Sequence, residues 1–108
     1  MDLPDFDRTT TLDARTIDGF RERGHAVVRG LASADELEAV RPAIERAAVE
    51  RAWDKRPLEE RDTYGKAFLQ SFNLWRVDPL IRRFVFGARF AKAAADLLGV
   101  DGVRLYHD

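Results

Sequence analysis

Residues 78–108, DPLIRRFVFGARFAKAAADLLGVDGVRLYHD, decide the predicted fold class, because they change from a helical to an extended pattern. The pair Asp78-Pro79 is typical of a helix start, with an N-cap residue followed by a proline at the first helical position. Gly87 interrupts this helix, and a second helix is expected to end at Gly99, where a glycine C-cap belongs. Over Val103 to Asp108 the pattern predicts a strand that has no turn to close it.

Upstream of this stretch, local signals predict two more helices. Residues 12–24, LDARTIDGFRERG, put apolar side chains on one face and end on Gly24, a second expected C-cap. Ser33 and Glu36 form a capping box, in which each side chain can bond the backbone amide of the other residue. A helix should therefore start after Ser33, and Pro42 inside it predicts a bend just before that proline.

The remaining segments are predicted to be a loop and short strands. Residues 53–66, WDKRPLEERDTYGK, are charged and broken by proline and glycine, which indicates a long loop or a mobile flap. Short strands are expected near His25–Arg29, Ala67–Phe72 and Val103–Asp108, where β-branched, aromatic and bulky apolar residues gather. The predicted fold class is α+β, predominantly helical.

Length and composition limit the classes of protein that the chain can represent. Its 108 residues suffice for one domain, which we expect over residues 13–108 behind a flexible leader at residues 1–12. The 18 basic and 19 acidic side chains nearly cancel, which argues against a nucleic-acid or membrane-surface partner. Without cysteine there is no disulfide, thiolate zinc site or thiol nucleophile. No signal-peptide or membrane-helix pattern is found, so a cytoplasmic location is expected.

His107 and Asp108 are residue types that bind iron in one class of oxygenases, but their spacing does not fit that role. Neighbouring side chains of a strand project to opposite faces, whereas the His-x-Asp spacing of the 2-His-1-carboxylate site returns both to one face. The chain contains two histidines, and the other, His25, lies at the start of a different predicted strand. We predict no metal ligand and no catalytic residue in this chain.

The order of segments resembles a known enzyme family. GFRERGHAVVRGLASADELEAVRPAIE, followed by FLQSFNLWRVDPLIRRFVFGARFAKAAADLLGVDGVRLYHD, is similar to the N-terminal part of the phytanoyl-CoA dioxygenase family. The resemblance covers residues 17–108, and the second block is the more specific. It implies a mostly helical N-terminal cap and the first strands of an incomplete double-stranded β-helix, or jelly roll. It also implies non-haem iron(II), 2-oxoglutarate and a small-molecule substrate for a complete family member.

The same resemblance implies that the iron ligands lie beyond Asp108. In the family the His-x-Asp pair follows the strand that RLYHD resembles, and the distal histidine and the arginine that binds 2-oxoglutarate come later. The expectation is therefore an N-terminal fragment that is inactive alone and binds no cofactor. His25 is a departure, since relatives more often have an aromatic residue before the two valines.

Several side chains are candidates for lining the pocket of the complete enzyme. Gln70 and Asn73 are polar residues in an apolar segment, so they need partners if they are buried. Tyr106 and Asp108 should share one face of the final strand and could border a cofactor pocket. Arg76, Arg82 and Arg83 could meet an anionic substrate, but a solvated helix face is the preferred interpretation, because such charge runs are common. Trp53 and Trp75 are expected to pack in the core or the cap.

Two other hypotheses stay open at this point. The chain could be a non-catalytic helical protein-interaction module, which would need an apolar surface patch. Nucleic-acid binding is disfavoured because both signs of charge are mixed along every segment. In the fragment hypothesis, the unpaired edge of the last strand also predicts self-association.

Overall fold

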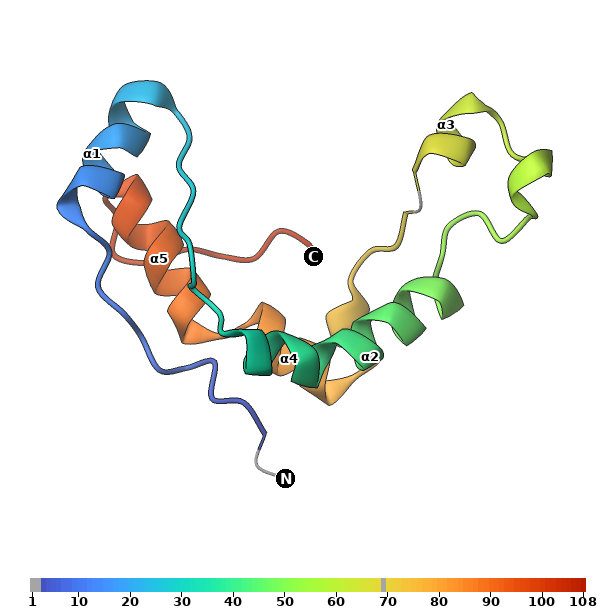
Figure 1. Cartoon of the computed structure of the whole chain (residues 1–108), viewed down its shortest axis with the longest axis horizontal. Helices are drawn as coiled ribbons and strands as arrows, with labels where there is room; N and C mark the ends of the chain where they lie inside the picture. Colours follow the sequence, from blue (N-terminus) through green and yellow to red (C-terminus); the bar gives the residue numbers. More distant parts are fainter. Residues whose placement is uncertain (1–2, 69) are drawn as a thin grey trace.

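The computed structural model describes residues 3–68 and 70–108, and in these residues it is helical throughout its regular structure. Figure 1 shows the helices in chain order. Their bounds, together with those of two short 3-10 turns (η), are α1 (Ala14–Arg23), α2 (Ala34–Glu50), η1 (Leu58–Glu60), α3 (Thr63–Ala67), η2 (Leu74–Arg76), α4 (Pro79–Val85) and α5 (Ala88–Leu98).

The prediction of an α+β fold with jelly-roll strands is wrong, since residues 3–68 and 70–108 contain no β-strand. His25–Arg29 and Val103–Asp108 form irregular or extended chain, and Ala67 is the last residue of α3. Leu69, inside the second predicted strand (Ala67–Phe72), lies outside the described residues. A strand obtains its backbone hydrogen bonds from a neighbouring strand, and none of these segments pairs with another in the described part.

The predicted end of α1 at Gly24 is confirmed, and its start is capped by Asp13, which was not predicted. The Asp13 carboxylate accepts a hydrogen bond of 2.8 Å from the Arg15 amide at the helix start. At the other end Gly24 has φ +80°, and its amide donates to the Phe20 carbonyl at 2.7 Å. A residue with a Cβ adopts this left-handed conformation only with strain, which is why glycine ends the helix.

The starts of α2 and α4 are confirmed as well. The Ser33 amide donates to the Glu36 carboxylate at 2.9 Å, while the Glu36 amide donates to the Ser33 hydroxyl at 3.1 Å. Pro42 lies inside α2 without ending it, and the bend predicted there stays a prediction. Asp78 caps α4 by accepting from the Leu80 amide at 2.8 Å.

The helices form an open curve and do not close around one core (Figure 1). At one end α1 packs on α5, and in the middle α2 packs on α4 and η2. A small buried cluster lies between α2, η2 and α4; its members are Ala43, Ala47, Leu74 and Ile81. The radius of gyration is 16.5 Å, whereas a compact domain of this length has one of about 13 Å. Many large apolar side chains consequently stay exposed.

Residues 3–12, the described part of the predicted leader, pack against α4 and α5. Phe6 is buried, and its ring meets Phe84 edge-on at 5.2 Å and Phe90 at 5.9 Å between centroids. The Arg89 amide donates to the Phe6 carbonyl at 3.0 Å. The flexibility expected of residues 1–12 stays a prediction, but the packing of Phe6 was not expected from the sequence.

Residues 53–70 leave the body of the molecule as a closed loop. Its ends meet where the Trp53 amide donates to the Gln70 carbonyl at 2.7 Å. The loop contains η1 and the short helix α3, which the sequence analysis missed, and Asp62 caps α3 by accepting from the Gly65 amide at 2.7 Å. Trp53 itself is 81% exposed, so the prediction that it packs in the core or the cap is wrong.

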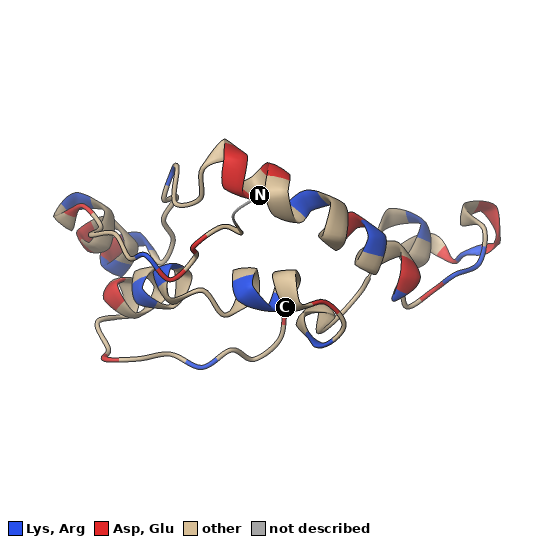
Figure 2. Ribbon diagram, turned by 90° about the horizontal axis from the view of Figure 1, so that it is seen from below, with Lys and Arg blue, Asp and Glu red and all other residues tan. Residues whose placement is uncertain are grey.

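Charged side chains of both signs alternate along the ribbon, as Figure 2 shows. The formal net charge is -1. Within the described residues, none of the helices combines the length and the apolar character needed to cross a bilayer.

Candidate functional site

The segment after Gly99 returns to η2, where two of the candidate pocket residues meet. The Asp108 carboxylate accepts a hydrogen bond of 2.9 Å from the Trp75 backbone amide, although the two residues are 33 positions apart. The Asn73 side-chain oxygen lies 3.3 Å from Nε1 of the Trp75 indole, which donates to it. Asn73 and Asp108 therefore hold the backbone and the ring of one tryptophan.

Asn73 has an unusual backbone conformation at this position. Its φ of 56° and ψ of 44° lie in the left-handed region, and it is the one non-glycine residue with positive φ in the described part of the chain. Asparagine tolerates this region better than most residues because its short side chain bonds locally. The conformation turns the chain from residue 72 into η2 and directs the Asn73 amide group to the Trp75 ring.

Tyr106 and His107 form an aromatic row with Phe72. The His107 ring meets Phe72 edge-on at 5.6 Å and lies 4.7 Å from the Tyr106 ring, measured between centroids. Tyr106 is 92% exposed and borders an open groove, to which Asp108 does not contribute. The opposite projection of His107 and Asp108 was inferred from a strand, and in this unpaired segment both side chains contact residues 72–75.

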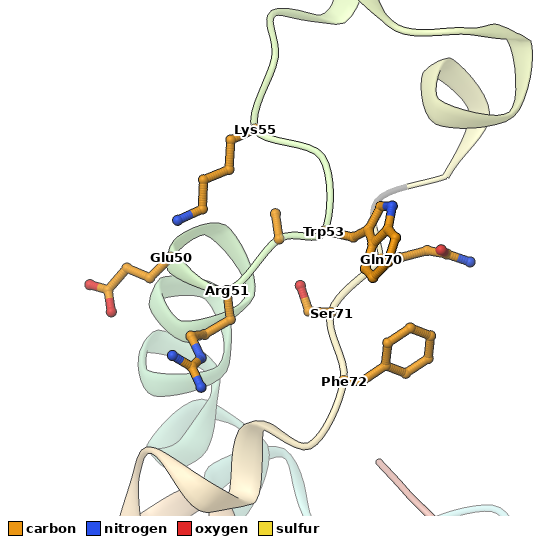
Figure 3. A pocket seen from close by; sticks show the side chains of 8 residues that line it. Glu50, Arg51, Trp53, Lys55, Gln70, Ser71 and Phe72 are labelled. Carbon is orange, nitrogen blue, oxygen red and sulfur yellow. The ribbon is translucent and has the colours of Figure 1, made fainter.

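Gln70 lies apart from this cluster, between two open cavities. Its side-chain amide donates to the Tyr64 hydroxyl. One cavity, of about 370 Å³, is shown in Figure 3; in it the side chains of Trp53 and Gln70 point away from those of Glu50 and Lys55. Gln70 thus borders these cavities without Asn73, Tyr106 or Asp108, and its role in the pocket of a complete enzyme stays a prediction.

Two of the three arginines that were candidates for anion binding contact aromatic rings, whereas the Arg83 guanidinium donates to the Pro4 carbonyl at 3.4 Å. The guanidinium groups of Arg76 and Arg82 lie 5.2 and 5.1 Å from the centre of the Trp75 ring, and that of Arg82 also lies 4.9 Å from Phe86. Such cation–π contacts stabilise an exposed pair by about 0.5–1 kcal/mol. This geometry gives Arg82 a packing role on the surface of α4.

The most connected charged residue of the structure, Arg89, was not a candidate. Its buried guanidinium donates to the carbonyls of Asp5, Arg8 and Leu31 at 2.8, 2.8 and 3.0 Å. It also binds both oxygens of the Glu36 carboxylate, at 2.6 and 2.9 Å. In the sequence, Arg89 sits between alanine and phenylalanine in an amphipathic helix, a context that gives no sign of these contacts.

Hydrogen bonds from Arg89 lower the pKa of Glu36 to about 2, with further contributions from the Ser33 amide and the charge of Arg89. The same pairing raises the pKa of Arg89 above its ordinary value. Glu36 both caps α2 and neutralises the buried arginine. The pair is therefore structural, and it joins residues 3–12, α2 and α5.

Among residues 3–68 and 70–108, no three His, Cys, Asp or Glu side chains gather closely enough to hold a metal ion. His25 is exposed in the segment between α1 and α2. The cluster at Trp75 provides one carboxylate, one amide and one imidazole, and the carboxylate and the amide already bond to Trp75. Its geometry fixes the position of the C-terminal segment.

Comparison with known proteins yields no relative of this chain. No family model matches it, and no curated protein or solved structure is significantly similar to it.

Proposed function

We propose that this chain forms the helical N-terminal cap of a non-haem iron(II), 2-oxoglutarate-dependent dioxygenase of the phytanoyl-CoA dioxygenase type. The proposal rests on the resemblance of residues 17–108 to that family. It also rests on one structural observation, an apolar groove that the described residues leave open. The strands that the resemblance implied within residues 3–68 and 70–108 are not part of the proposal.

The groove runs between α4, α5 and the C-terminal segment, and its volume is about 720 Å³. Phe86 on its wall is 44% exposed, and Leu98 is 56% exposed. From the facing segment Leu105 contributes a side chain that is 41% exposed. Burial of such side chains stabilises a protein by about 1.5–3 kcal/mol each, so a further layer of structure packed here would gain considerable free energy.

The described residues do not supply the ligand set of the iron site. That site needs two histidines and a carboxylate on one face, whereas here His107 and Asp108 are adjacent and His25 is distant in sequence. When bound in a complete enzyme, iron and 2-oxoglutarate would supply oxygen activation for hydroxylation of a carbon centre. The chain of 108 residues is proposed to contribute packing to that enzyme and to be inactive alone.

The coding sequence after the Asp108 codon tests this proposal. The proposal expects a continuing reading frame with His-x-Asp within about 20 codons, in the spacing that the facial triad uses. A continuation of comparable length without that motif would contradict it.

The proposal implies that the complete enzyme acts on a small-molecule substrate. It also implies a location in the cytoplasm. Nucleic acid and membrane are not proposed partners, because acidic and basic side chains alternate along the chain (Figure 2). A gel shift at low salt and fractionation of cells that express the tagged protein test these points.

A second candidate function, a non-catalytic interaction module, is favoured by the same open groove, since exposed apolar patches are typical of binding surfaces. Light scattering and thermal melting separate the two functions. A module should be a defined monomer or dimer that melts cooperatively. A cap without its sheet should melt with low cooperativity or self-associate through the extended segment at residues 102–108.

A further inference from the structure

The loop of residues 53–70 encloses a second cavity, of about 280 Å³, that no part of the proposed function uses. Three aromatic side chains line it, those of Trp53, Tyr64 and Phe68. They are 81%, 56% and 58% exposed, although aromatic rings are among the side chains that gain most from burial. The exposure of three aromatic side chains that line the same cavity suggests that this surface binds a ligand.

Two of these rings form one wall. Tyr64 and Phe68 are four residues apart, at α3 and just after it, and their ring centroids lie 4.9 Å apart at a tilt of 39°. The indole of Trp53 comes from the opposite end of the loop. The cavity therefore has aromatic surface on more than one side.

Gln70 ties the two walls together. Its backbone carbonyl accepts from the Trp53 amide at 2.7 Å, and its side chain donates to the Tyr64 hydroxyl. Both walls are thus held by one residue at the base of the loop. In Figure 3 the side chains of Trp53 and Gln70 lie on the same side of the chain.

The charged side chains of the cavity leave an excess of negative charge. Two carboxylates, those of Asp54 and Asp62, and one guanidinium, that of Arg56, line it. An oxygen of Asp54 and one of Asp62 lie 3.4 and 3.2 Å from the point where a Cβ on Gly65 would stand, beside the Cβ of Arg61 at 3.1 Å. Both carboxylates therefore lie at the Gly65 side of the cavity, which we call its floor. Arg56 is held by Asp54 through bonds of 2.9 and 2.7 Å.

None of the three rings is occupied by a protein cation in the described residues. The guanidinium contacts with aromatic rings found there fall on Trp75, Phe86 and Phe6. The exposed surface of Trp53, and the parts of Tyr64 and Phe68 that do not pack on each other, are therefore open to a cation from solution.

We propose that the aromatic cavity of the 53–70 loop binds a methylated ammonium group, such as that of choline or of a trimethylated amine. The ring faces attract a cation through their quadrupoles, and a quaternary ammonium ion is desolvated more easily than a primary one because it donates no hydrogen bonds. Asp62 and Asp54 add charge attraction from the floor. The proposal is independent of the dioxygenase function.

The test is a titration of the purified chain with choline chloride, followed by NMR shifts of the Trp53 indole, in parallel with 3,3-dimethylbutan-1-ol. That alcohol has the same shape with carbon in place of the charged nitrogen. The proposal expects saturable binding of choline, at least about 10-fold tighter than that of the alcohol, because cation–π attraction distinguishes the two. Equal affinities, or no saturation below about 50 mM choline, would overturn it.

Variants separate binding from folding. Trp53→Leu should weaken choline binding by at least about 10-fold, while Leu58→Ala, at another exposed side chain of the same loop that does not line the cavity, should leave it unchanged. Asp62→Asn keeps a side chain that can cap α3 and removes only the charge, so binding should weaken about threefold or more. Unchanged choline affinity in Trp53→Leu would contradict binding by the aromatic rings. Unchanged choline affinity in Asp62→Asn would contradict the contribution of the Asp62 charge.

Discussion

Replacing Arg89 by methionine should release residues 3–12 from the helices, because this one guanidinium holds three backbone carbonyls and the Glu36 carboxylate. Methionine preserves most of the length and apolar character of the side chain. What is lost is five hydrogen bonds, two of them to a carboxylate whose side chain is 19% exposed.

The free-energy cost of Arg89→Met can be estimated from the ion pair between Arg89 and Glu36. Removing one partner of a buried ion pair destabilises a protein by about 3–5 kcal/mol. Because Glu36 keeps some contact with water, the lower end applies, about 3 kcal/mol, which corresponds to an increase of roughly 100-fold in the opening equilibrium of the segment.

Hydrogen–deuterium exchange at residues 88 and 89 measures this opening directly. The Ala88 amide donates to the Asp7 carboxylate and the amide of residue 89 to the Phe6 carbonyl, each at 3.0 Å, so both report on the attachment of the N-terminal segment. In Arg89→Met their exchange should accelerate by roughly 100-fold. The matched control is Arg83→Met, which loses one bond of 3.4 Å to Pro4 and should change exchange by less than about threefold.

A partner variant checks the mechanism. Glu36→Gln retains the capping box, since glutamine also serves at this position, and in combination with Arg89→Met it removes the unpaired charge. The double variant should recover part of the lost protection. Exchange at residues 88 and 89 that stays within about threefold of the native rate in Arg89→Met would refute the reasoning and assign the attachment to Phe6 alone.

Three further predictions concern the helices and the C-terminal segment. The pKa of Glu36 is lowered to about 2, whereas in the unfolded chain it is about 4.5. The stabilising contribution of the Glu36 carboxylate is therefore complete above pH 4.5 and is lost as the pH falls toward 2. Helical circular dichroism should decline across that window, and a flat signal in Glu36→Gln is the control. Asp108→Ala removes the hydrogen bond to the Trp75 amide and should release the C-terminal segment at a cost of about 1–3 kcal/mol. The release is measured as faster hydrogen exchange of the Trp75 amide. Asp101→Ala, at an exposed residue, should leave that exchange rate unchanged. Ile81→Ala opens a cavity in the buried cluster of α2, η2 and α4 and should lower the free energy of unfolding of these helices by about 2–5 kcal/mol; a loss below about 1 kcal/mol in denaturant titration would contradict a packed core at this place.

The helix ends were predictable from the sequence because capping is local. Asp13, the Ser33–Glu36 box and Asp78-Pro79 each act within three residues of the helix start, and a glycine C-cap requires only its own φ. The Ser33–Glu36 box and Asp78-Pro79 located the starts of α2 and α4, and Gly24 located the end of α1, whereas the Asp13 cap was recognised only in the structure. Helix α3 was missed because its five residues follow a proline and lie in a charged, aperiodic stretch.

Strands could not be predicted from local signals in this way, because a strand forms only when a second segment pairs with its backbone. Val27 and Val28 have the residue types of a strand, but in the described part of the chain no second segment pairs with them. The long-range contacts were equally hidden. Arg89 bonds to residues 53 to 84 positions away, and Asp108 to one 33 positions away, and no spacing rule connects such pairs.

The candidate pocket residues were partly brought together. Asn73 and Asp108 meet at Trp75, as polar residues in an apolar surrounding need partners. The role of Gln70 in the pocket of a complete enzyme stays a prediction, and its contacts with Tyr64 and Trp53 were not anticipated. The exposure of Trp53 could not be predicted from the sequence, because residues 53–66 follow neither a helical nor a strand pattern that would assign its side chain to a buried or an exposed face.

The proposed role as a helical cap can be tested by anaerobic calorimetric titration with iron(II) and 2-oxoglutarate. The titration compares the chain of 108 residues with the same chain extended by the sequence that its gene encodes after Asp108. The account predicts that the shorter chain binds neither ligand, because the ligand set of a 2-His-1-carboxylate site is not formed by its residues. It predicts that the extended chain binds both. Micromolar binding by the shorter chain, or none by the extended one, would contradict the proposed role as a helical cap.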